Sequence, residues 1–261
     1  KIESVGTPLK DWDIQINYGI KTGFNDAFII NTEKRNEILD NCCSDEERTK
    51  TAELIRPILR GRDIKRYGYN WADLWLIATF PSRHYDIEMY PAVKAHLLSF
   101  GKERLEQTGK KYIINGEEIK ARKKTSNKWF ETQDSISYWD DFLLPKLIYP
   151  ETTQGAFFAY DETGLFLDKT CFMMISKHAR YLQATLSSQL FEFAYKRIFS
   201  SVELGQHGFQ YNKHALIKLH VKKFNESDSV AYSDEFFYNC YGITNEEIEY
   251  IVGAIQSLQN Q

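Results

Sequence analysis

Short apolar runs separated by turn residues are the feature that most limits the fold of this sequence. Four of them follow one another, KLIYPE (146–151), AFFAY (156–160), LFLD (165–168) and CFMMIS (171–176), and LWLIATF (74–80) precedes them. Runs of this length between turn residues are typical of β-strands. Helical patterns occur among them without the regular alternation of a doubly wound parallel sheet. The sequence therefore predicts a mixed α+β fold.

Other segments fill in this fold. DIQIN (13–17) and AFIIN (27–31) are predicted strands joined by the glycine-bearing turn GIKTGFND. Ser44 and Glu47 have the spacing of a capping box before a helix whose apolar residues run to Leu59, with Pro57 as its end or a kink. Helices are also expected from Pro91, over 181–198 with Leu182, Leu186, Leu190 and Phe193 in the core, and over 245–258. The segment 207–221 is expected to form a strand, a short helix and an edge strand.

The charge is unevenly distributed along the chain. The whole sequence carries a net charge of −3, but residues 225–261 contain seven acidic residues and no Lys or Arg. This tail accounts for more than the entire negative charge and leaves residues 1–224 with a net charge of +4. A polyanionic partner is therefore compatible with the body of the chain.

Composition also limits the compartment. No stretch approaches the roughly 18 apolar residues of a membrane span, and the first residues lack the pattern of a secretion signal. The four cysteines form no CxxC motif and are expected to be reduced and mostly buried. We expect a cytoplasmic protein without membrane contact, and a segment of a longer polypeptide.

Motifs of common catalytic sites are missing. In NYGIKTGFND the Lys and the second glycine have the wrong order for a Walker loop, whose backbone amides must surround the phosphates before the Lys reaches them. The sequence also lacks the GxG dinucleotide fingerprint, the Pro-Pro motif of amino-methyltransferases, HExxH and GxSxG. No catalytic residue and no metal site is assigned.

Basic and polar side chains suited to nucleic acid are present instead. RGRDIKR (60–66) is one basic loop, and Lys120, Arg122, Lys123, Lys124 and Lys128 run through a polar stretch ending in Trp129 and Phe130. Lys and Arg neutralise phosphates, and Arg, Asn, Gln and carboxylates read base edges. By themselves these signals are weak, because a lysine run usually forms a solvated face.

The order of several blocks indicates a family. Eight blocks follow one another along the chain: INYGIKTGFNDAFII, IRPILRGRDIKRY, YPAVKAHLLSF, KTSNKWFETQD, PKLIYPE, FAYDETGLFLDKTCFMM, LQATLSSQLFEFAYKRI and GFQYNK. Together they resemble the C-terminal specificity domain of TaqI-like adenine methyltransferases. The same domain is the target-recognition domain of Type IIG restriction-modification enzymes. The resemblance covers about residues 19–224. It implies a strand-rich, partly barrel-like lobe with several packed helices that contacts base edges of double-stranded DNA in the major groove.

The resemblance also implies a domain organisation. Residues 1–224 would form the DNA target-recognition domain, and residues 225–261 an acidic linker and a C-terminal helix. Catalysis would belong to an upstream methyltransferase domain of the same polypeptide that uses S-adenosylmethionine, with a nuclease domain and Mg²⁺ in those members that also cut DNA. No cofactor is expected in the present segment.

Fourteen residues are candidates for DNA contact, each with a structural alternative. A phosphate would be gripped from a tight turn by Lys21 and Thr22, which otherwise only shape a hairpin, and contacted by Asn212 and Lys213, with Asn212 otherwise a helix N-cap. DNA would be faced by Arg60, Arg62, Lys65 and Arg66, which otherwise form a salt-bridged loop, and its groove would be lined by Lys123, Lys124, Asn127 and Lys128, which otherwise decorate a loop. Bases would be read from a loop tip by Glu151 and Gln154.

Two other functions remain open at this point. One is a free-standing metal-dependent nuclease built from scattered Asp and Glu residues. The other is a protein-interaction module that docks through aromatic side chains and the terminal helix, which would show no salt-dependent affinity for DNA.

Overall fold

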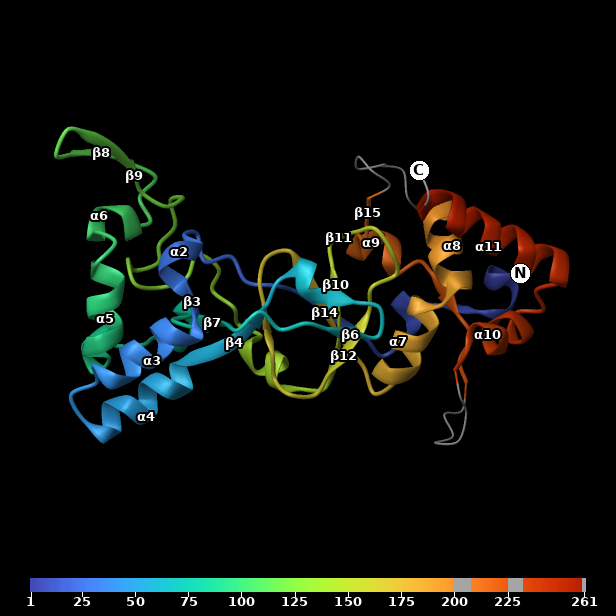
Figure 1. Cartoon of the computed structure of the whole chain (residues 1–261), viewed down its shortest axis with the longest axis horizontal. Helices are drawn as coiled ribbons and strands as arrows, with labels where there is room; N and C mark the ends of the chain where they lie inside the picture. Colours follow the sequence, from blue (N-terminus) through green and yellow to red (C-terminus); the bar gives the residue numbers. More distant parts are fainter. Residues whose placement is uncertain (200–207, 225–231, 260–261) are drawn as a thin grey trace. The chain divides into compact units, whose positions relative to one another are not determined.

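The computed structural model describes residues 1–199, 208–224 and 232–259, which divide into two compact units (Figure 1). Unit 1 consists of residues 1–19, 60–70 and 141–261, and unit 2 of residues 20–59 and 71–140. Residues 225–231 of the expected acidic linker lie outside the described part of the chain. The expected division at residue 224 therefore stays a prediction.

Unit 1 contains most of the strands. Its elements are α1 (Ile2–Val5), β1 (Thr7–Pro8), η1 (Leu9–Asp11), β2 (Gln15–Tyr18), η2 (Gly61–Asp63), β5 (Ile64–Lys65), β6 (Gly68–Tyr69), β10 (Lys146–Pro150), β11 (Thr152–Thr153), β12 (Ala159–Asp161), β13 (Phe166–Leu167), β14 (Cys171–Ile175), α7 (Ala179–Ser187), α8 (Gln189–Ile198), β15 (Phe209–Gln210), α9 (Lys213–Leu216), β16 (His220–Val221), α10 (Asp234–Cys240) and α11 (Asn245–Gln259). The short helix η5 (Trp139–Leu143) precedes β10.

The main sheet of unit 1 is antiparallel, in the order β12-β10-β14-β2. Its register pairs Leu147 with Met174 and Met174 with Ile16. The predicted strand-like runs over 146–176 are confirmed, and β10 is buried at every position. A strand buried on both faces reads as a continuous apolar run, which explains why KLIYP shows no alternation.

Aromatic side chains form much of the unit 1 core. Tyr149 stacks on Phe172 at 5.4 Å between ring centroids, and Tyr211 lies 4.4 Å from Tyr195 and 4.7 Å from Phe158. The same core includes buried side chains of α10, of α11 and of the residue that follows α10: Phe237, Tyr238, Tyr241, Ile251 and Ile255. The terminal helices therefore pack onto the body of unit 1.

The longest predicted helix is divided into two. Ser188 ends α7 and caps α8, with its hydroxyl accepting the Phe191 N–H at 3.4 Å. Leu182, Leu186 and Leu190 are buried as predicted, and Phe193 is partly buried. The break separates two helices of strongly amphipathic sequence and redirects the second.

Unit 2 has a smaller sheet covered by short helices. Its elements are α2 (Asn25–Phe28), β3 (Ile29–Asn31), α3 (Thr32–Asp40), α4 (Asp45–Leu54), β4 (Ile55–Leu59), β7 (Leu74–Ile77), η3 (Pro81–Arg83), η4 (Ile87–Met89), α5 (Pro91–Leu98), α6 (Lys102–Leu105), β8 (Lys111–Ile114) and β9 (Glu117–Lys120). β7 lies between β4 and β3 and is antiparallel to both.

Helix boundaries in unit 2 follow local chemistry. Ser44 caps α4 as predicted, accepting the Glu47 N–H at 3.1 Å. The expected continuation to Leu59 is wrong, because the helix ends at Leu54 and Pro57 lies within β4. Pro restricts the residue before it to extended conformations, which favours a strand there. The helix from Pro91 ends at Leu98, before Gly101 with a φ of 85°.

The two predicted strands on either side of GIKTG do not pair with each other. β2 pairs with β14, and β3 pairs with β7. A helical turn, α2, comes before β3. The hairpin interpretation of this segment is therefore wrong, although both strands form.

The α+β class is confirmed. Within each unit, the described strands form open sheets that do not close into a barrel, and helices cover them. None of the described helices has the length and apolar composition needed to cross a bilayer.

A fully buried ion pair holds the β10–β12 region. Lys146 and Asp161 are both inaccessible to solvent, with the ammonium 2.5 Å from the carboxylate. The ammonium also donates to the Phe142 carbonyl at 2.5 Å, and the carboxylate accepts the Leu165 N–H at 3.0 Å. Burial lowers the pKa of Lys146, and the nearby carboxylate opposes this shift. Each partner therefore depends on the other for its charge to be satisfied.

We expect Asp161→Asn to lower the free energy of unfolding by about 3–5 kcal/mol, because it leaves a buried ammonium without its counterion. Urea unfolding of the purified chain measures this loss. The matched control is Glu162→Gln, which removes the partner of Arg180 in an ion pair whose side chains are 59% and 65% exposed. Its expected loss is below about 1 kcal/mol. Losses of equal size in the two variants would contradict the assigned role of the buried pair.

Candidate nucleic-acid interface

The fourteen predicted DNA-contact residues fall into two groups, one in each unit. Unit 2 contains Lys21, Thr22, Lys123, Lys124, Asn127 and Lys128; unit 1 contains Arg60, Arg62, Lys65, Arg66, Glu151, Gln154, Asn212 and Lys213.

Arg122 organises the basic stretch of unit 2. The sequence places it in a basic stretch suited to nucleic acid, but its side chain is buried, with 4% relative exposure. The guanidinium donates to the carbonyls of Leu105 at 2.7 Å, Thr22 at 2.8 Å, Glu131 at 2.8 Å and Trp129 at 2.6 Å. Burial lowers the pKa of Arg122 to about 10, and Glu131 opposes this shift. One charged group thus fixes segments that are far apart in sequence.

Backbone hydrogen bonds reinforce this arrangement. The Gln133 N–H donates to the Thr22 carbonyl at 3.2 Å, and the Asp134 N–H donates to the Lys21 carbonyl at 3.2 Å. Asp134 also accepts the Lys21 N–H through its carboxylate at 3.1 Å. The turn that carries Lys21 therefore lies against the loop that follows the lysine run.

The lysines of this region remain exposed. Lys21, Lys123, Lys124 and Lys128 are all solvent-exposed, and no carboxylate of the described residues forms an ion pair with them. The ammonium of Lys128 lies 5.5 Å from the centre of the Phe130 ring. Unpaired cations on a fixed surface are suited to binding phosphates.

Thr22 and Asn127 shape the loops. The buried Thr22 hydroxyl donates to Asn25 at 2.6 Å and accepts the Phe24 N–H at 3.2 Å. The Asn127 amide donates to the carbonyls of Thr132 at 3.2 Å and Gln133 at 2.9 Å. These contacts hold both side chains against unit 2 itself, and direct contact with DNA stays a prediction.

Glycine is needed at two points of GIKTG. Gly23 has a φ of 81°, and a Cβ there would lie 3.0 Å from Cδ of Arg122. A Cβ on Gly19 would lie 1.8 Å from the carbonyl oxygen of Asp168, within unit 1. At both positions the close approach is to the protein's own atoms.

In unit 1, the loop RGRD is fixed by an internal ion pair. Arg60 donates to both carboxylate oxygens of Asp63, each at 2.9 Å. Burial opposes ionisation of Asp63, but the hydrogen bonds from Arg60 prevail and lower its pKa. The Gly61 N–H donates to the Thr170 hydroxyl at 2.8 Å. The neighbouring Arg62 and Lys65 side chains are exposed.

Arg62 and Lys65 line a groove of about 520 Å³ together with Gln154. Its remaining lining is Gly61, Ile64, Pro150, Thr152, Thr153, Phe157 and Gly208. The groove combines two exposed cations, an exposed amide and an aromatic side chain. Such a set can contact phosphates and base edges at the same time.

The other unit 1 candidates have structural partners or lie outside this groove. Arg66 pairs with the fully buried Glu192, which also binds Lys196 at 2.7 Å. Asn212 is the N-cap of α9, accepting the His214 N–H at 2.8 Å, as the alternative interpretation predicted. The Lys213 ammonium donates to the Ile16 carbonyl at 2.9 Å. Glu151 is exposed but does not line the groove.

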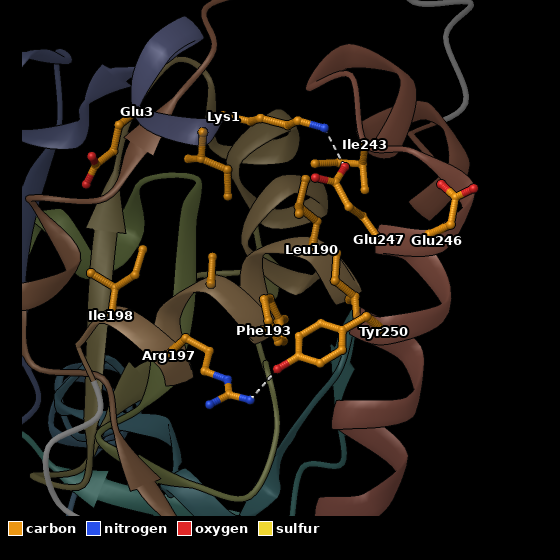
Figure 2. Close-up of a pocket in the computed structure, with 13 residues that line it drawn as sticks. Lys1, Glu3, Leu190, Phe193, Arg197, Ile198, Ile243, Glu246, Glu247 and Tyr250 are labelled. Carbon is orange, nitrogen blue, oxygen red and sulfur yellow. Dashed lines mark hydrogen bonds and ion pairs between the residues drawn. The ribbon is translucent and has the colours of Figure 1, made fainter.

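A larger groove of about 710 Å³ has a different character (Figure 2). Its lining comes from α1, α8, α11 and the segment before α11: Lys1, Ile2, Glu3, Leu190, Phe193, Ala194, Arg197, Ile198, Ile243, Glu246, Glu247, Tyr250 and Ile251. Figure 2 shows Arg197 directed at the Tyr250 hydroxyl, a contact of 2.8 Å. Apolar side chains and three carboxylates make this groove unsuited to DNA.

Metal ligands do not cluster in the described residues: no group of three or more His, Cys, Asp or Glu side chains there could hold an ion. None of the four cysteines, which all lie in the described part of the chain, forms a disulfide. The expectation that they are mostly buried is wrong, because Cys171 is buried, Cys42 and Cys240 are partly buried and Cys43 is exposed.

Comparison with known proteins places this fold in context. Residues 56–213 match the family model of the TaqI-like C-terminal specificity domain. The chain is also similar to the structure of MmeI, a Type IIL restriction-modification enzyme solved in complex with DNA, at 13% identity and a TM-score of 0.54, covering 98% of this chain and 37% of that one. It is similar as well to the structure of the Type IIG restriction endonuclease BpuSI, at 14% identity and a TM-score of 0.55, covering 99% of this chain and 31% of that one. The chain thus spans about a third of the length of these proteins.

We expect Arg122→Met to loosen unit 2 by removing four hydrogen bonds from a buried guanidinium, at a cost of about 3 kcal/mol or more. Hydrogen–deuterium exchange should become faster over residues 20–25 and 122–134 and stay unchanged in β10 and β14. Lys123→Met, on the exposed neighbour, is the control and should alter neither region. Unchanged exchange in the Arg122 variant would contradict its role as an anchor.

Proposed function

Because this chain belongs to the family of TaqI-like C-terminal specificity domains, we propose that it recognises the target sequence of a restriction-modification enzyme by binding double-stranded DNA. Family membership carries this proposal, since the matched residues 56–213 include the groove residues Arg62, Lys65 and Gln154 and three of the unit 2 lysines, Lys123, Lys124 and Lys128. The similarity in fold to MmeI, whose structure was solved in complex with DNA, agrees with this proposal.

We assign phosphate contacts to the exposed lysines. Lys21, Lys123, Lys124 and Lys128 of unit 2 have no ion-pair partner among the described carboxylates, so their charge is available to a polyanion. Lys65 plays the same part at the groove of unit 1. These contacts supply affinity and register without reading sequence.

We assign base reading to Arg62 and Gln154. A guanidinium matches the O6 and N7 acceptors of guanine, and a side-chain amide matches N6 and N7 of adenine. Both side chains are exposed and line one groove, with Gly61 beneath Arg62 held by Thr170. Glu151 is a weaker candidate because it lies outside the groove lining.

The chemistry would reside elsewhere in a longer polypeptide. We propose that this chain is itself non-catalytic and directs an adenine methyltransferase domain of the same polypeptide, which uses S-adenosylmethionine, and Mg²⁺ as well if the enzyme cuts DNA. The chain's span of about a third of MmeI and BpuSI leaves room for such domains.

A second candidate function rests on the apolar groove of Figure 2. Ile198 and Tyr250 are 52% and 59% exposed there, and α11 forms one wall. Exposed apolar grooves commonly mark protein contacts. We propose that this groove receives an apolar segment of the catalytic part of the same polypeptide, so that docking accompanies DNA recognition.

We expect the isolated chain to bind a random-sequence DNA duplex weakly, with an affinity that falls as salt rises. In fluorescence anisotropy, the slope of log K against log salt should shrink by about 0.9 for each phosphate-contacting lysine replaced. We therefore expect Lys21→Ala combined with Lys124→Ala to shrink it by about 2.

In the same assay, Arg62→Ala tests whether the groove of unit 1 contacts DNA. Arg60 is left unchanged, because replacing it would also remove the ion-pair partner of Asp63. Lys50→Ala, on a lysine that pairs with Glu46 at 2.5 Å, is the control and should leave the slope unchanged. Salt-independent binding, or none, would refute the DNA proposal. Cleavage of the duplex by the isolated chain after adding Mg²⁺ would instead favour a nuclease.

A further inference from the structure

A projecting β-hairpin in unit 2 contains none of the fourteen candidate DNA-contact residues. Strands β8 and β9 are joined by Asn115 and Gly116, with φ values of 52° and 86°. Positive φ at both central residues defines the type I′ turn, whose twist matches that of a two-stranded ribbon. Figure 1 shows the hairpin extending as a ribbon beyond α6.

One face of this hairpin is exposed and combines cations with an apolar side chain. The register places Lys111 opposite Lys120 and Ile113 opposite Glu118, so all four share a face. Ile113 is 81% exposed, the largest exposed fraction among the large apolar residues of the described chain. The described residues leave Ile113 uncovered, and an exposed apolar side chain on a two-stranded ribbon is suited to contact with a partner.

The distribution of charged side chains on the hairpin indicates what kind of partner it suits. The base of the hairpin and the residues that follow carry five exposed lysines: Lys110, Lys111, Lys120, Lys123 and Lys124. The two acidic residues, Glu117 and Glu118, lie toward the tip, and Glu118 pairs with Lys111 at 2.9 Å. A surface that is positive at its base and apolar and acidic toward its tip fits a groove whose edges are phosphates and whose floor is base edges.

The hairpin is held firmly at its base. The Ala121 N–H donates to the Lys110 carbonyl at 2.9 Å, and the Gly109 N–H donates to the Arg122 carbonyl at 2.8 Å. The Tyr112 hydroxyl donates to the Glu106 carboxylate at 3.1 Å. The residue whose guanidinium fixes the turn of Lys21 therefore also closes the hairpin ladder.

We propose that hairpin 111–120 enters a groove of double-stranded DNA, with the lysines at its base on the flanking phosphates and Ile113 against base edges. A two-stranded ribbon fits the major groove, which is about 12 Å wide. An isoleucine there can contact a thymine methyl group, and a carboxylate near the tip can accept from the amino group of cytosine. This inference rests on the proposed DNA-binding function and adds a specific reading element to it.

The test uses Ile113→Asp in the whole chain, with duplexes selected from a random pool for binding to the unmodified chain. Because Ile113 is 81% exposed, the variant should fold normally, and circular dichroism verifies this. We expect its affinity for selected duplexes to fall about 10-fold or more, since a carboxylate replaces an apolar base contact. Met89→Asp, at a residue of the same unit that is 50% exposed, makes the same charge change and should lower affinity less than about 2-fold.

Photo-cross-linking gives a second readout. A photoreactive amino acid at position 113 should cross-link to the selected duplex, and the same group at position 89 should not. If the unmodified chain binds DNA but Ile113→Asp binds equally well and position 113 gives no cross-link, the hairpin inference fails while DNA recognition stands. If the unmodified chain binds no duplex, the proposed function itself fails. Cross-links from position 113 to protein alone would also overturn the inference.

Discussion

The buried guanidinium of Arg122 is the contact on which the candidate DNA surface of unit 2 depends. Its four carbonyl acceptors lie at residues 22, 105, 129 and 131, and its own carbonyl closes the base of the β8–β9 hairpin. The exposed lysines on these segments therefore extend from a backbone that hydrogen bonds hold in place. Preorganised cations lose less conformational entropy on binding than cations on a mobile loop. Unit 1 has a comparable arrangement, because the ion pair between Asp63 and Arg60 fixes the loop on which Arg62 is exposed.

Much of this arrangement could be predicted from the sequence. The strands over 146–176 were recognisable because each apolar run is bounded by turn residues, and Ser44 and Asn212 were recognisable as caps because their side chains are the type that accepts a backbone N–H. The family was recognisable from the order of blocks along the chain, and the match over residues 56–213 confirms it.

Tertiary contacts account for what the sequence did not predict. A basic stretch does not reveal which cation is buried, and the burial of Arg122 beside the exposed Lys123 depends on carbonyls that only the fold brings around it. The helix expected to reach Leu59 gives way to β4, because pairing with β7 outweighs the local helical pattern. The sequence does contain one local signal of the β8–β9 hairpin: Asn115-Gly116 follows the apolar Ile113 and Ile114, and Asn-Gly is a preferred pair for a two-residue hairpin turn.

Chemical footprinting of lysines tests the central claim most directly. The chain is acetylated under mild conditions with and without a DNA duplex, and the reactivity of each lysine is measured by mass spectrometry. Protection of Lys21, Lys65, Lys123, Lys124 and Lys128 by DNA, with Lys50 unaffected, is the predicted result. Equal reactivity of all lysines with and without a saturating duplex, or protection confined to other surfaces, would contradict the account.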